Sequence, residues 1–135
     1  MIDSAQVIYG YLTYAGSTLN TLVGNHVWQT RGPKGWQNDS AALIFDIISE
    51  GSSHTTGGLE LTVQFDCYGG TNKMTDAKAV YRALNAALSG IALGNVGATG
   101  GIALALQTGG DPSTIETGSE WPRSRAIYDL TLLGT

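Results

Sequence analysis

A change of hydrophobic period between residues 59 and 91 constrains the fold more than any other feature of this chain. Over residues 59–68, LELTVQFDCY, apolar and polar residues alternate, which is typical of a strand with one buried and one polar face. Beyond Gly69 and Gly70, apolar residues recur at spacings of three and four, the pattern of an amphipathic helix. The sequence therefore predicts a strand, a turn and a helix that lies across the apolar face of a sheet. The predicted inner strand residues are Leu59, Leu61, Val63, Phe65 and Cys67, the outer ones Glu60, Thr62, Gln64, Asp66 and Tyr68, and the helix stripe is Ala77, Val80, Tyr81, Leu84, Leu88 and Ile91.

Weaker patterns predict the remaining elements. An apolar stripe predicts an N-terminal helix, interrupted at Gly16, and a second helical turn over residues 17–23. Strands are predicted at 27–28, 42–48, 102–107 and 126–133, with connections at 29–40, 49–58 and 108–124. Residues 1–135 are thus expected to form one α+β domain, with a mostly antiparallel sheet of four or five strands and both helices packed on one face. The N-terminal stripe is Ala5, Ile8, Tyr9, Leu12, Ala15 and Leu19.

Composition favours a protein that packs against other proteins. Only 13% of the residues are charged, 42% are hydrophobic, and 19 of 135 are glycine, so few charges need to be desolvated at a contact. The net charge of −4 and the lack of a Lys/Arg cluster argue against tight nucleic-acid binding. No apolar run reaches 18 residues and the N-terminus lacks a basic start, so we expect no membrane span and a chain that stays in the cytoplasm until assembled.

No residue pattern indicates catalysis. The single cysteine, Cys67, is expected to be a small buried hydrophobe, and His26 and His54 have no Cys or acidic neighbour at metal-ligand spacing. Asp46, Asp66 and Asp129 are interpreted as solvated residues on the outer face of the sheet. The glycine pairs lack the residues of a phosphate-binding loop. The sequence therefore predicts no catalytic residue, no cofactor and no metal.

Several residues are candidates for docking onto protein partners. Aromatic residues and arginine are enriched at interface anchors, and tryptophan and arginine lie together near residues 31–36 and 121–125. Two isoleucines on the outer face of the 42–48 strand favour a partner there as well. The predicted interface residues are Arg31, Lys34, Trp36, Ile44, Ile48, His54, Trp121 and Arg123.

The chain resembles the tail terminators, or tail-completion proteins, of long-tailed bacteriophages, similar to minor tail protein U. The resemblance rests on an N-terminal helix, the segment LVGNHVW, the strand phrase TVQFDCY followed by an Ala-rich helix, and the closing AIYDLTLL. The chain departs from the family where Asp39, Ser40 and Ala41 replace a proline that often precedes the first long strand, and in the glycine-rich GNVGATGG segment.

The resemblance implies a non-enzymatic virion protein. Family members form a ring, usually of six, at the head-proximal end of the tail, where they end tail-tube polymerisation and offer a docking surface to the head connector. The implied partners are further copies of the chain, the tail tube protein and the head–tail connector protein, with DNA passing through the lumen without specific binding. The alternatives are another ring component of the tail or neck, such as a tube or connector subunit, and a small cytoplasmic enzyme.

Overall fold

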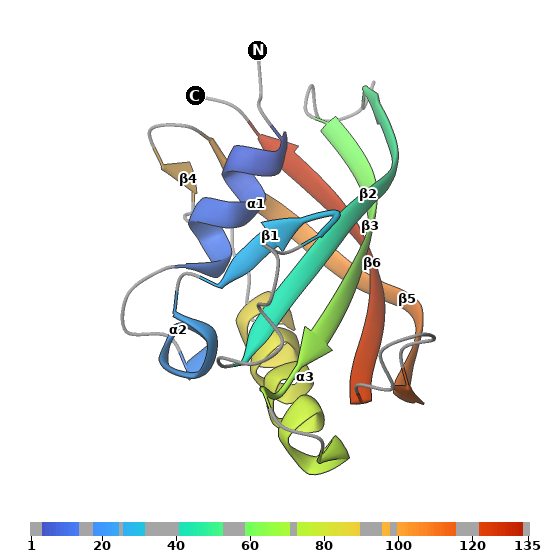
Figure 1. Ribbon diagram of the computed structural model, residues 1–135. Helices are drawn as coiled ribbons and strands as arrows, with labels where there is room; N and C mark the ends of the chain where they lie inside the picture. The colour runs from blue at the N-terminus through green and yellow to red at the C-terminus, as the bar shows by residue number, and fades with distance from the viewer. Residues whose placement is uncertain are drawn as a thin grey trace.

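A computed structural model describes residues 4–13, 18–24, 26–31, 41–52, 59–70, 73–89, 96–97, 100–115 and 122–133. These residues form three helices and six strands wrapped around one core (Figure 1). The helices are α1 (Ser4–Leu12), α2 (Thr18–Val23) and α3 (Met74–Ser89). The strands are β1 (Val27–Gln29), β2 (Ala42–Ser52), β3 (Leu59–Tyr68), β4 (Val96–Gly97), β5 (Gly100–Ile115) and β6 (Pro122–Leu133).

The six strands form one sheet in the order β1-β2-β3-β6-β5-β4. All neighbours in this order are antiparallel except the short β1, which runs parallel to β2. Of the strands that the sequence predicts, those over residues 59–68 and 126–133 are the best candidates for the sheet centre, and they do form the central pair. The four long strands β2, β3, β6 and β5 therefore alternate in direction across the sheet.

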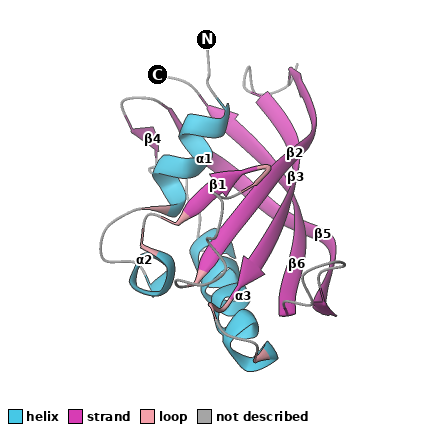
Figure 2. Ribbon diagram, in the orientation of Figure 1, coloured by secondary structure: helices cyan, strands magenta, loops and turns pink. Residues whose placement is uncertain are grey.

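All three helices pack on the same side of the sheet (Figure 2). The inner face of β3 contributes Leu61, Val63, Phe65 and Cys67 to the core, all at most 2% exposed. Phe65 makes an edge contact with the ring of Tyr128 in β6, with centroids 5.9 Å apart, and a tilted contact with Phe45 in β2 at 6.5 Å. Helix α3 covers this centre because its apolar stripe faces inward, and it includes Ala77, Val80, Leu84 and Leu88.

The α+β class, the strand–turn–helix unit and the one-sided packing of the helices are confirmed. Three predicted strand boundaries are wrong. Strand β5 continues to Ile115 and β6 begins at Pro122, so most of the connection expected at 108–124 is a β-hairpin arm. Strand β2 continues to Ser52, four residues past the expected Ile48.

The inner stripe of the first helix also differs from the prediction. Tyr9 is 40% exposed, whereas Val7 is 3% exposed and belongs to the core. Ile8 and Leu12 are buried as expected. Ala15 and Gly16, together with Ile91 of the α3 stripe, lie outside the described residues.

Candidate functional site

The outer face of the sheet, opposite the helices, is the surface on which the predicted interface residues Ile44 and Ile48 lie. Its two ends differ, and we call them the closed end and the open end. The closed end comprises Ala42, Ile44, Asp66, Tyr68, Arg123 and Arg125, which share one part of the β2, β3 and β6 register. The open end comprises Ile48, Ser49, Glu60, Thr62, Leu106, Asp129 and Thr131.

The closed end is covered within the chain itself, which corrects two sequence predictions. Asp66 and Tyr68, expected on a solvated face, are 9% and 2% exposed. The Arg125 Nε donates a hydrogen bond to Asp66 Oδ1 at 2.8 Å and forms an ion pair with it. Asp66 lies between Ile44 of β2 and Arg125 of β6 in the register, so side chains from both neighbouring strands shield it from water.

Ile44 shows how little of the closed end remains for a partner. The side chain was expected to point outward, and it is only 7% exposed. Its register partner in β1 is Trp28, whose ring stacks on His26 with centroids 5.2 Å apart. Ile44 is therefore largely covered before any partner arrives.

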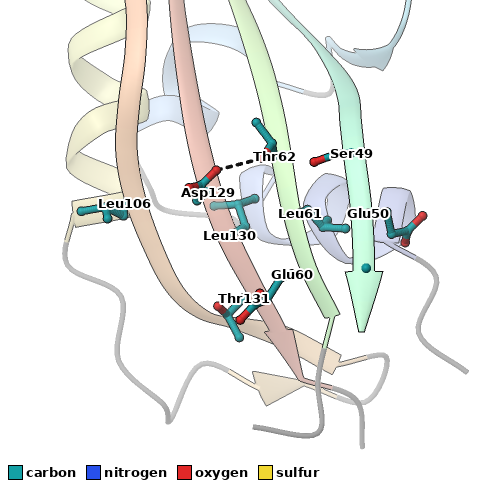
Figure 3. A pocket seen from close by; sticks show the side chains of 10 residues that line it. Ser49, Glu50, Glu60, Leu61, Thr62, Leu106, Asp129, Leu130 and Thr131 are labelled. Atoms are coloured by element: carbon teal, nitrogen blue, oxygen red, sulfur yellow. Dashed lines mark hydrogen bonds between the residues drawn. The ribbon is translucent and has the colours of Figure 1, made fainter. Parts of the chain in front are cut away.

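The open end exposes apolar and polar groups together. Ile48 and Leu106 are 56% and 62% exposed. Between them, Thr62 Oγ1 donates a hydrogen bond to Asp129 Oδ1 at 2.9 Å (Figure 3). The register places Leu106, Asp129, Thr62 and Ser49 in one row across β5, β6, β3 and β2, with Ile48 next to Ser49.

An open hollow of about 500 Å³ lies along this row. Its lining mixes carboxylates with threonines and leucines and includes no histidine or cysteine. It is lined by Ser49, Glu50, Gly51, Glu60, Leu61, Thr62, Leu106, Asp129, Leu130 and Thr131 (Figure 3). The hollow therefore presents hydrogen-bonding and apolar groups side by side.

Two β-bulges explain why Ile48 and Leu106 are exposed. In β2 the pairing shifts between Ile47 and Ser49, so Ile48 is the extra residue of a bulge. In β5 the pairing shifts between Ile102 and Leu104, which reverses the alternation and turns Ala105 inward and Leu106 outward. Leu106 could not be recognised from the sequence, because strict alternation from the buried Ile102 would place it in the core.

The other predicted interface residues are placed as follows. Arg31 is exposed directly after β1, and Arg123 is half-buried at the closed end. Lys34, Trp36, His54 and Trp121 lie outside the described residues. Their role as contact residues stays a prediction.

The buried cysteine confirms the structural interpretation made from the sequence. Cys67 is 0% exposed on the inner face of β3, and burial, with a smaller contribution from the charge of Asp66, raises the pKa of its thiol well above the ordinary value. Of the three aspartates considered earlier, Asp66 pairs with Arg125, and Asp129 accepts a hydrogen bond from Thr62.

Metal-ligand clusters and membrane-spanning helices can be judged only for the described parts of the chain. No group of three or more His, Cys, Asp or Glu side chains gathers there in a way that could hold a metal ion. Within the same residues, no helix has the length and apolar character needed to cross a membrane.

Comparisons with known proteins give a likeness in fold. Neither a protein-family model nor a curated protein sequence matches the chain. A chain in the solved structure described as "Virion of native gene transfer agent (GTA) particle" has a similar fold, with a TM-score of 0.66 and 18% sequence identity. The likeness covers 96% of this chain and 93% of that one. This chain therefore has, over nearly its whole length, the fold of a subunit from a virion particle.

Proposed function

We propose that this protein is a non-enzymatic structural subunit of a phage-like virion. The observation that carries the proposal is the likeness in fold to a chain of a gene transfer agent virion over 96% of the sequence. The open end of the sheet supports it, because two large hydrophobic side chains are more than half exposed there. Exposed apolar groups in a chain with only 13% charged residues favour burial against protein neighbours.

Within the virion, we propose the role of a tail terminator. The chain forms a ring, of six subunits by the family resemblance, at the head-proximal end of the tail. The ring ends tail-tube polymerisation and docks the head connector. The net charge of −4 fits a lumen that lets DNA pass, because a strongly basic lining would retain the phosphate backbone.

A tube or connector subunit is the second candidate, since rings of similarly sized subunits also make up those parts of a particle. The copy number separates the two roles. A tube subunit is present in many stacked rings, whereas a terminator is present in one. A small enzyme is the candidate from another class, and the exposed, histidine-free lining of the hollow gives it no support.

The test is to locate the chain on particles. Virions, or prophage lysates of the source strain, are labelled with an antibody against this chain and imaged by electron microscopy. Label confined to the junction of tail and head is the expected result. Label along the whole tail would replace the terminator with a tube subunit, and particles without label would refute a virion role.

A further inference from the structure

We propose that copies of this chain associate edge to edge: the free edge of β5 in one copy pairs antiparallel with the free edge of β2 in the next. The sheet then continues from subunit to subunit. The inference specifies how the subunits of the proposed ring contact one another. Only the closure of that ring rests on the proposed function. The pairing itself is argued from the strands alone.

The first free edge belongs to β5. This strand pairs with β6 along its length, but among the described residues β4 reaches only Gly100 and Gly101 on the other side. Residues 106–110 are all exposed, so neither face of the strand is covered over that stretch. An uncovered edge strand presents a row of peptide groups ready to pair with another strand.

Among the described residues, the second edge without a neighbouring strand is that of β2 beyond Phe45, at the opposite side of the same sheet. The parallel partner β1 ends early: the Leu43 N–H donates to His26 O and the Thr30 N–H donates to Phe45 O, both at 2.9 Å. Because peptide groups alternate along a strand, the next group that faces this edge is that of Ile47, which lies past the register of β1. Residues 48–51 are all exposed.

Strand direction makes the two edges compatible. The long strands alternate in the order β2, β3, β6, β5, so β2 and β5 run in opposite directions. A rotation that carries one copy onto its neighbour around a ring keeps these directions, so β5 meets the next β2 as an antiparallel strand. The contact uses two different surfaces of each subunit, as a closed ring requires.

The exposed hydrophobic residues fit the same contact. Leu106 and Ile48 stand at the two ends of one row across the outer face, one beside each free edge. Continuing the row into the next subunit brings Leu106 of one copy beside Ile48 of its neighbour. The pairing thus covers the two most exposed large hydrophobic side chains of the described residues.

Charge selects this pairing over twofold pairing of β2 with itself. Residues 46–52 of β2 contain Asp46 and Glu50, whereas residues 104–110 of β5 carry no charge. A twofold β2–β2 contact would gather four carboxylates, two from each copy, along one strand pair, and like charges on paired strands are destabilising. Neither segment contains a lysine, the residue with which many edge strands resist pairing.

Site-specific cross-linking tests the pairing. Chains with Ile48→Cys and chains with Leu106→Cys are treated with a short bis-maleimide reagent, each alone and mixed in equal amounts. We expect cross-linked dimers only in the mixture, and a ladder of higher products from the double variant. Unmodified chains serve as the background control, because their only thiol, Cys67, is fully buried. Dimers from Leu106→Cys chains alone would indicate twofold β5–β5 contact, and they would overturn the proposal, as would the absence of any cross-link.

A pair of charge variants gives an independent test. Leu106→Glu places a negative charge on the outer face near Asp46 of the next copy, whereas Leu106→Lys places a positive one there. We expect Leu106→Glu to weaken self-association by about tenfold or more relative to Leu106→Lys, measured by sedimentation velocity. Leu22→Glu is the matched control, because Leu22 is 38% exposed on α2 and belongs to neither of the two strands proposed to pair. Equal effects of Glu and Lys at position 106 would contradict the pairing.

The outcomes separate this inference from the proposed function. Label at the head–tail junction without cross-linking would refute the edge pairing and leave the virion role standing. Cross-linking in the purified chain without label on particles would refute the virion role and leave the edge pairing standing. Circular dichroism of each variant verifies that the substitution at an exposed position leaves the fold intact.

Discussion

Replacing Gly69 with alanine should destabilise the protein through a steric clash between β3 and α3. A Cβ atom at position 69 would lie 2.5 Å from the carbonyl carbon of Asp76 and 2.6 Å from the amide nitrogen of Ala77. These are backbone atoms of the first turns of α3, so no flexible side chain can move aside. The helix cannot retreat easily either, because Ala77 and Val80 are at most 1% exposed against the sheet. Overpacking of this kind costs about 1–3 kcal/mol of unfolding free energy.

Gly10→Ala is the matched control, and its expected effect has the opposite sign. Gly10 lies in α1, and a Cβ there would meet nothing within 4 Å. Alanine favours a helix over glycine by about 1 kcal/mol, so this variant should be slightly more stable than the parent. Urea unfolding at two protein concentrations measures both changes and separates folding from self-association. A Gly69→Ala variant with the parent's transition midpoint and slope would refute the proposed clash.

Three further predictions concern buried polar groups. Arg125→Met should lower the free energy of urea unfolding by about 1–3 kcal/mol, because it leaves the largely buried Asp66 carboxylate without its ion pair. Adding Asp66→Asn to this variant should recover part of the loss. Cys67 should react with a thiol reagent only as fast as the chain unfolds, so faster modification would contradict its burial. Burial, with smaller effects of Tyr81 and Cys67, raises the pKa of the Tyr128 hydroxyl from 10.0 to about 12. The stability that this shift contributes is therefore fully present below pH 10 and is lost as the pH rises through 12. The unfolding free energy of the parent chain should fall by roughly 2 kcal/mol over this pH range. The Tyr128→Phe variant should show no such fall when its unfolding is measured over the same range.

The β3–α3 unit was predictable because local signals and long-range packing agree there. Residues 59–65 alternate in burial as they alternate in polarity, and the α3 stripe repeats with helical spacing. The sheet order around this unit depends on contacts between distant residues. The prediction of a central β3–β6 pair succeeded because both strands are long and apolar on one face.

The β5–β6 arm could not be predicted because its local sequence favours turns. The segment TGGDPSTI contains two glycines and a proline, yet it pairs with residues 122–127 of β6. Gly110 adopts a φ of 133°, and a Cβ there would lie 2.9 Å from the Ala126 Cα, so glycine lets the strands approach. Pairing with a distant partner strand outweighs the local preference, and a sequence pattern carries no information on that partner.

The sequence predicts that Asp66 is exposed to solvent, and this prediction is wrong for a related reason. Alternation places the residue on the outer face correctly, but exposure there depends on what the neighbouring strands contribute. Register sets Arg125 beside Asp66, and the guanidinium both shields the carboxylate and satisfies it. Alternation in one strand therefore predicts the direction of a side chain. Its exposure depends on which residues the two neighbouring strands place beside it.

The division of the outer face limits where a neighbouring subunit can gain binding energy. At the closed end, Ile44 and Tyr68 are already buried and Asp66 already has its cation, so a partner would gain little by covering them. At the open end, Ile48 and Leu106 together offer the apolar area that the chain has not yet removed from water. Both free strand edges lie beside these same residues. Hydrophobic burial and backbone pairing therefore favour the same contact, and a partner that binds the closed end instead would have to be recognised mainly by polar groups.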